Sequence, residues 1–136
     1  MPGTLAEEKI DQDSGIIIGE SGMNDSDPEQ EDNNARLAHY LDLLSDENPG
    51  NRWKGAVSLG RLKDLTAVDA LITALGDDDD RVRVKAIWAL GEMRDVRAIP
   101  SLKKLYRSES DDIRENISEA LDTINRAAGD QQHTGE

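Results

Sequence analysis

Apolar side chains recur through residues 34–126 at spacings of three and four, the pattern of one face of an α-helix. In the middle of this region the apolar positions are Val68, Leu71, Ile72 and Leu75, followed by Val82, Ala86, Ala89, Leu90 and Met93. No segment alternates with a period of two for long enough to predict a strand. The pattern therefore predicts an all-α fold built from pairs of helices.

The helix pairs repeat without gaps, in three copies at residues 34–64, 65–95 and 96–126. One arginine and one leucine recur at fixed phases, as Arg52, Arg83 and Arg114 and as Leu59, Leu90 and Leu121. A two-helix unit of this size cannot bury its apolar face alone, so stacked copies must share one core. We therefore expect an α-α superhelix, or solenoid, of three two-helix repeats.

Residues that favour helix N-caps stand at matched phases before each expected helix. The first helices should follow Asn33, Asp64 and Asp95, and the second helices should follow Asn48, Asp79 and Ser110. Pro49 then takes the first helical position, where a missing N–H costs nothing.

The middle copy carries a family pattern. Residues 64–75 read Asp-Leu-Thr-Ala-Val-Asp-Ala-Leu-Ile-Thr-Ala-Leu, and residues 79–95 read Asp-Asp-Arg-Val-Arg-Val-Lys-Ala-Ile-Trp-Ala-Leu-Gly-Glu-Met-Arg-Asp. These segments resemble the HEAT repeat family, specifically its short HEAT-like repeats of the phycobilisome lyase type. Copies one and three depart from the pattern, with Gly55 and Ile117 where the middle copy has Ala86. The resemblance implies an α-solenoid that serves as a binding scaffold.

Composition divides the chain further. Its 136 residues carry 29 acidic and 16 basic side chains, a net charge of −13. Residues 1–33 hold ten acids and one base, a net charge of −9, with few large apolar residues, so we expect a disordered acidic tail. The polar stretch 127–136 should be a frayed C-terminal tail. No apolar run reaches the ~18 residues of a membrane span, and we expect a cytoplasmic protein.

Candidate chemistry is sparse. There is no cysteine, which excludes disulfides and thiolate metal sites, and there are two histidines, His39 and His133. An EF-hand loop starting at Asp77 would need glycine at Val82 and glutamate at Trp88, so the run 77–80 is better explained by Asp79 as an N-cap. We therefore expect no enzyme activity, no metal and no cofactor.

The repeated arginines allow two interpretations. They could form a row of cations that binds carboxylates of a ligand, or a structural ladder in which each guanidinium ties a helix start to a neighbouring copy. Recurrence of Arg52, Arg83 and Arg114 at one phase favours the ladder, because a ligand is rarely periodic.

The positions one, two, five and nine after each repeated arginine lie off the core face and do not repeat. We name this set the second-helix face: Trp53, Lys54, Val57 and Arg61 in copy one, Val84, Lys85, Trp88 and Glu92 in copy two, and Glu115, Asn116, Glu119 and Thr123 in copy three. In the family that the chain resembles, second helices line the inner curve. The charge on this face changes from +2 to zero to −2 along the copies. Its tryptophans either bind a partner or fill gaps between copies.

Two functions follow as hypotheses. The first is a small adaptor, expected to be a monomer, that binds a protein or peptide through the second-helix face. The alternative is a non-catalytic or chaperone-like subunit of a lyase system that handles a bilin or another prosthetic group. The negative charge disfavours nucleic acid as a partner. Lys103 and Ser118 stand where the middle copy has Ile72 and Ile87, so we expect the array to end at copy three.

Overall fold

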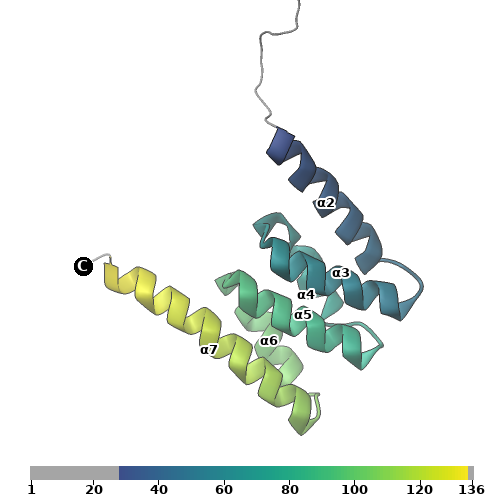
Figure 1. Cartoon of the computed structure of the whole chain (residues 1–136). Coiled ribbons are helices and arrows are strands. Elements are labelled where there is room, and N and C mark those ends of the chain that lie inside the picture. Colours follow the sequence, from purple (N-terminus) through teal and green to yellow (C-terminus); the bar gives the residue numbers. More distant parts are fainter. Residues whose placement is uncertain (1–27, 135–136) are drawn as a thin grey trace, which may run out of the picture. The chain divides into compact units, whose positions relative to one another are not determined.

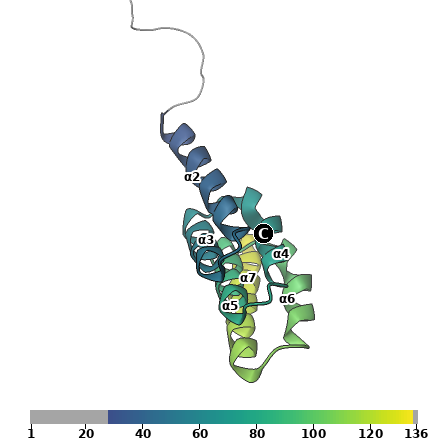
Figure 2. The same ribbon diagram turned by 90° about the vertical axis from the view of Figure 1, so that its right-hand side faces the viewer.

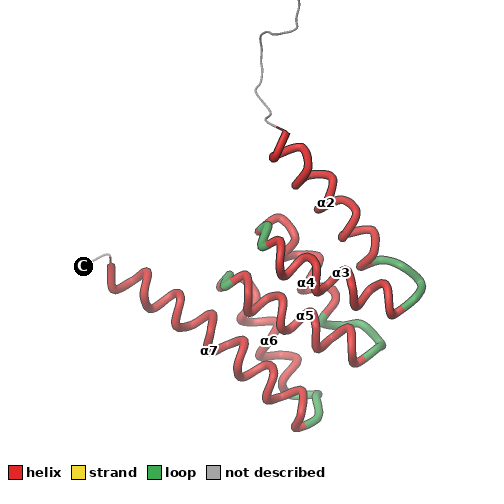
Figure 3. Tube along the Cα trace, viewed as in Figure 1, coloured by secondary structure: helices red, strands yellow, loops and turns green. Residues whose placement is uncertain are grey.

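The computed structural model describes the backbone of residues 28–134 and the side chains of residues 31–129. This part of the chain is helical and contains no strand, which confirms the all-α class. The helices are α2 (Pro28–Leu44), α3 (Pro49–Leu62), α4 (Val68–Ala74), α5 (Asp80–Met93), α6 (Ile99–Tyr106) and α7 (Asp111–Thr134). Single 3₁₀ turns, Leu65–Ala67 and Val96–Ala98, precede α4 and α6. Figure 3 shows that short loops join the helices.

The chain divides into two units, Met1–Arg36 and Leu37–Glu136, with the boundary inside α2. Within the second unit, α3, α5 and α7 lie side by side in one layer, and α4 and α6 lie in another (Figures 1 and 2). Each second helix contacts the second helix of the next copy, so the unit is the predicted solenoid.

One continuous core runs between the two layers. Its largest fully buried side chains come from all of α3 to α7, and they are Leu59, Val68, Leu71, Val82, Ile87, Leu90, Leu102, Ile117 and Ile124. Leu121, which is equivalent to Leu59 and Leu90, is only partly buried. The middle copy is therefore the best covered.

Four of the six predicted N-caps form, at Asn48, Asp64, Asp79 and Asp95. The side chains of Asn48 and Asp79 accept hydrogen bonds from the N–H groups of Gly50 and Arg81 and begin α3 and α5. Asp64 and Asp95 cap the 3₁₀ turns in the same way. The α7 helix begins directly after Ser110.

The predicted N-cap at Asn33 is wrong, because α2 begins five residues earlier, at Pro28. Residues 28–33, assigned to the disordered tail, are therefore helical, and residues 1–27 lie outside the described part of the chain. Proline suits the first helical position, because its missing N–H would have no partner within the helix there. Arg36 also pairs with Asp32, one turn away, at 3.7 Å.

The helix α7 continues to Thr134, past the point near Ala127 where we expected fraying. Lys63 and Arg94 end α3 and α5 in the left-handed conformation, with φ of 59° and 56°. The equivalent residue of copy three, Asn125, lies inside α7. Ala127 and Ala128 then extend the helix, since alanine has the highest helix propensity.

Glycines allow the second helices to pack closely. A Cβ atom at Gly60 would lie 2.9 Å from the Cα of Ala89 in α5, and one at Gly91 would lie 3.2 Å from the Cα of Ala120 in α7. These glycines share one phase of the repeat. The third member of the series is Asp122, an exposed carboxylate on α7. At this phase of the repeat, α7 therefore carries a charged side chain in place of the glycine.

Candidate protein-binding face

The arginine ladder has a defined geometry at its first two positions. Arg52 binds the carboxylate of Asp77 with two hydrogen bonds, Nε to Oδ2 at 2.8 Å and Nη2 to Oδ1 at 3.0 Å. Its Nη1 donates to the carbonyl oxygen of Asp46 at 3.0 Å. Arg83 likewise reaches the Glu109 carboxylate at 2.6 Å and the Asp77 carbonyl at 2.8 Å. Each guanidinium therefore joins its own helix start to an acid of the following copy.

Arg114 lacks such an acid from a later copy within the described residues. It donates to the carbonyl oxygen of Tyr106 at 2.9 Å, and its guanidinium lies 5.1 Å from the centre of the Tyr106 ring. Its one acidic contact, with the fully exposed Asp111, is long at 3.8 Å. The arginines of copies one and two thus bind an acid of the following copy, and the arginine of copy three does not.

Two residues of the acidic run 77–80 take part in such contacts: Asp77 binds Arg52, and Asp79 binds Arg81 and caps α5. Burial alone would raise the pKa of Asp77, but hydrogen bonds from Arg52 and from the Asp79 N–H, with the charge of Arg52, bring it below its usual value. The guanidinium and N–H of Arg81 lower the pKa of Asp79 to about 2. Among the described side chains of residues 31–129, no three of the metal-binding types come together.

The residues of the second-helix face all lie on α3, α5 and α7, and none is fully buried. Lys54, Arg61, Glu115 and Glu119 are exposed, whereas Val57, Lys85, Glu92, Asn116 and Thr123 are half-buried. Val84 departs from the set, because it packs against the core.

The two tryptophans combine both sequence interpretations. Trp53 is 37% exposed and Trp88 is 38% exposed, yet each touches an adjacent copy. The Nζ of Lys85 lies 5.5 Å from the centre of the Trp53 ring, within the range of a cation–π interaction. The Trp88 ring lies over Gly60, where a Cβ would be 2.7 Å from its Cζ3. The indoles thus rest on neighbouring copies and leave part of their surface open.

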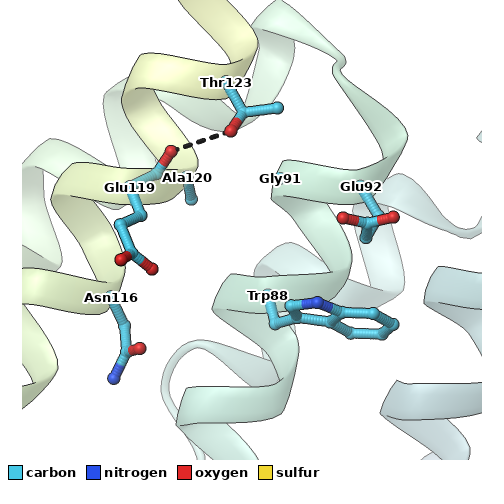
Figure 4. Close-up of a pocket in the computed structure, with 7 residues that line it drawn as sticks. All are labelled: Trp88, Gly91, Glu92, Asn116, Glu119, Ala120 and Thr123. Atoms are coloured by element: carbon cyan, nitrogen blue, oxygen red, sulfur yellow. Dashed lines mark hydrogen bonds between the residues drawn. The ribbon is translucent and has the colours of Figure 1, made fainter.

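A pocket of about 260 Å³ lies on this face between α5 and α7 (Figure 4). It brings together five residues of the predicted set from two copies, namely Trp88, Glu92, Asn116, Glu119 and Thr123. The Oγ1 of Thr123 donates to the carbonyl oxygen of Glu119 at 3.0 Å, which orients its side chain on the α7 wall. The copy-one members, Trp53, Lys54, Val57 and Arg61, do not line it.

Gly91 and Ala120 complete the pocket, and our sequence analysis did not identify them as site residues. Their small size leaves the hollow between the two helix walls unfilled. The recurrence of glycine at residues 60 and 91 was the available signal. Three larger hollows lie elsewhere. Those of about 450 and 520 Å³ lie among the first helices, and no residue of the second-helix face lines them. The third, of about 400 Å³, lies along α7 and is lined by Glu115 and Glu119 of the second-helix face, together with Tyr106 and Arg114.

Comparison with known protein families identifies the family of this chain. The family model for HEAT repeats matches residues 37–122, more than half of the chain. The chain therefore belongs to the HEAT repeat family. HEAT repeats generally mediate protein–protein interactions as scaffolds. Comparison with curated protein sequences gave no match. The narrower phycobilisome lyase type stays a prediction.

A membrane-crossing helix is absent from the described residues, because none of their helices is both long and apolar enough.

Proposed function

We propose that this chain is a small HEAT-repeat adaptor without enzyme activity, which binds a segment of another protein across the second-helix face. The observation that carries the proposal is the pocket at Trp88, on the same face as the half-exposed Trp53. Tryptophan and arginine dominate the binding energy of protein interfaces, and this face presents both, since copy one holds Trp53 and Arg61 and copy two holds Trp88.

The size of the pocket supports a side chain as its occupant. Sites for small molecules and cofactors are typically about 300–1,000 Å³ and mostly apolar. The hollow at Trp88 is smaller, at about 260 Å³, and has two carboxylates in its walls, Glu92 and Glu119. An absorbance band at wavelengths beyond those of tryptophan, in protein purified from its native source, would instead favour a prosthetic-group role.

Peptide display against the full chain tests the proposal. We expect the wild type to enrich a family of peptides, and the double variant Trp53→Ala/Trp88→Ala to lose that enrichment. The matched control is Leu65→Ala/Val96→Ala, which removes two apolar side chains, 51% and 52% exposed, that belong to the 3₁₀ turns. Circular dichroism verifies that both variants stay helical.

Two outcomes would contradict the proposal. One is the absence of any enriched peptide family on the wild type. The other is enrichment that persists in the tryptophan double variant and disappears in the control. The second result would move the binding site away from the second-helix face.

A further inference from the structure

The two junctions between second helices are equivalent by the repeat, but one is filled and the other is open. At the first junction, between α3 and α5, the indole of Trp88 covers Gly60. At the second junction, between α5 and α7, the equivalent glycine is Gly91 and the residue in place of the indole is Glu119. The short carboxylate does not cover the hollow, which becomes the pocket. The first junction therefore shows that a flat group can occupy such a hollow.

The walls of the pocket define its charge. Glu119 lines the pocket from α7, and Trp88 and Glu92 line it from α5, with side chains that extend away from α7 in Figure 4. None of its seven lining residues is basic. Within the described side chains Glu119 has no ion pair, and Glu92 has one long contact, 3.8 Å to the exposed Lys63. The pocket thus offers unneutralised negative charge at Glu119, next to the partly exposed side chain of Trp88.

We infer that this pocket receives an arginine side chain of the protein partner, an inference that rests on the proposed function. A guanidinium is planar, stacks on an indole and binds a carboxylate with two hydrogen bonds. Its stem can cover the small residues Gly91 and Ala120. The protein already places a guanidinium over an aromatic ring, because Arg114 lies over Tyr106.

Lysine fits less well than arginine. Its ammonium is a compact, strongly hydrated charge that neither stacks on a ring nor forms a bidentate pair with a carboxylate. It therefore gains less binding free energy from a ring beside an acid. A neutral side chain would leave Glu119 unpaired and partly desolvated, at a cost in binding free energy.

The charge of the rest of the face sets the direction of the partner. Copy one presents the exposed cations Lys54 and Arg61 at the opposite end from the pocket. Neighbouring helices pack about 8–10 Å apart, and an extended chain advances about 3.3 Å per residue. An acidic residue of the partner, about three to five residues from its arginine, would therefore lie near these cations.

The test uses ¹⁵N-labelled full-length protein and three blocked peptides, Gly-Gly-X-Gly-Gly, in which X is arginine, lysine or citrulline. Citrulline keeps the planar shape of arginine without its charge. We expect saturable shifts of the indole N–H of Trp88, the side-chain amide of Asn116 and the backbone N–H of Gly91. The arginine peptide should bind most tightly, and the citrulline peptide should cause no saturable shift.

Two variants on α7 provide the matched comparison. Glu119→Gln should weaken binding of the arginine peptide by about two- to fivefold, the range for an exposed ion pair. Asp122→Asn removes the same charge from an exposed residue outside the pocket, so it should leave the affinity unchanged.

The inference is overturned if the citrulline peptide binds as tightly as the arginine peptide, or if the two variants have equal effects. It is also overturned if the shifts centre on Trp53, or if no peptide causes a shift. None of these results by itself contradicts the proposed function, which the display experiment tests with peptides of any sequence. Enriched peptides that lack arginine would contradict the inference alone.

Discussion

The same residue type has different surroundings in each copy, as the arginine ladder shows. Arg83 is 20% exposed and binds Glu109, which is only 7% exposed. Arg114 occupies the equivalent position but bonds mainly to carbonyl groups of its own copy. A carboxylate that is removed from water depends on its partner, whereas a backbone carbonyl near solvent can bond to water instead.

Arg83→Gln should therefore lower the free energy of unfolding by about 1–3 kcal/mol, since it leaves the Glu109 carboxylate without its charged donor. Arg114→Gln should cost less than about 1 kcal/mol. Urea unfolding followed by circular dichroism measures both. Equal shifts of the two midpoints would show that the acid of the following copy contributes nothing.

The capping aspartates make the free energy of unfolding depend on pH. The pKa of Asp79 lies at about 2, and a hydrogen bond from the Arg97 guanidinium chiefly lowers the pKa of Asp95. An unfolded aspartate titrates near pH 3.9. Because the folded values are lower, the stabilisation is present above about pH 4 and is lost as the pH falls toward 2.

The thermal midpoint should accordingly decrease as the pH is lowered from about 4 to about 2. Asp79→Asn keeps an N-cap residue but removes the titrating group, so its midpoint should fall less over the same interval. Parallel pH profiles for the wild type and this variant would rule out Asp79 as a contributor.

At the scale of the element, the ends of α3 and α5 are strained. Lys63 and Arg94 adopt the left-handed conformation that suits glycine at helix C-termini. A side chain with a Cβ pays about 1–2 kcal/mol for this conformation. Both helices thus end at a residue whose side chain disfavours the backbone conformation that it adopts.

Arg94→Gly should raise the free energy of unfolding by about 0.5–1 kcal/mol, because it relieves this strain at some cost in unfolded-state entropy. Arg126→Gly is the matched control, since Arg126 is exposed inside α7. There the same change should destabilise by up to about 1 kcal/mol. Chemical denaturation of the two variants should give midpoint shifts of opposite sign.

At the scale of the whole repeat array, a residue's burial depends on whether its copy has neighbours on both sides. Leu90 is fully buried in the middle copy, whereas the equivalent Leu121 in copy three is only partly buried. Solenoid stability is approximately a sum of repeat and nearest-neighbour terms. The free energy of unfolding that is lost when a core leucine is truncated should therefore depend on the copy in which the leucine lies.

Leu90→Ala should destabilise by about 2–5 kcal/mol, and Leu121→Ala by clearly less. Urea midpoints for the two variants compare these losses directly. Similar shifts would mean that the third copy is packed as tightly as the second.

Local patterns in the sequence were enough to predict the repeat, the all-α class and most helix starts. Asp64, Asp79 and Asp95 act as caps through contacts within two residues, so their role is visible from the sequence alone. The start of α2 was missed because Asn33 matches Asp64 and Asp95 in phase but lies within a helix that begins at Pro28.

The pocket could not be predicted, because it arises from what each helix places opposite the next. Trp88 and Glu119 occupy equivalent positions, and only the register of α7 on α5 shows that the glutamate leaves a hollow over Gly91. Gly55 is a similar case: a Cβ there would lie 2.7 Å from the backbone nitrogen of Leu44, so its apparent departure from the repeat pattern permits close contact with α2.

The glycine at each helix crossing has a consequence for protein engineering. A duplicate of residues 65–95 inserted after Asp95 would place its Ala89 over the original Gly91, the contact that Gly60 already makes with Ala89. Its Asp77 would meet the original Arg83 as Asp77 now meets Arg52. The middle copy is thus a module from which a longer array can be built. Copy three is not such a module, because Asp122 would place a carboxylate where the next helix must pack against a glycine.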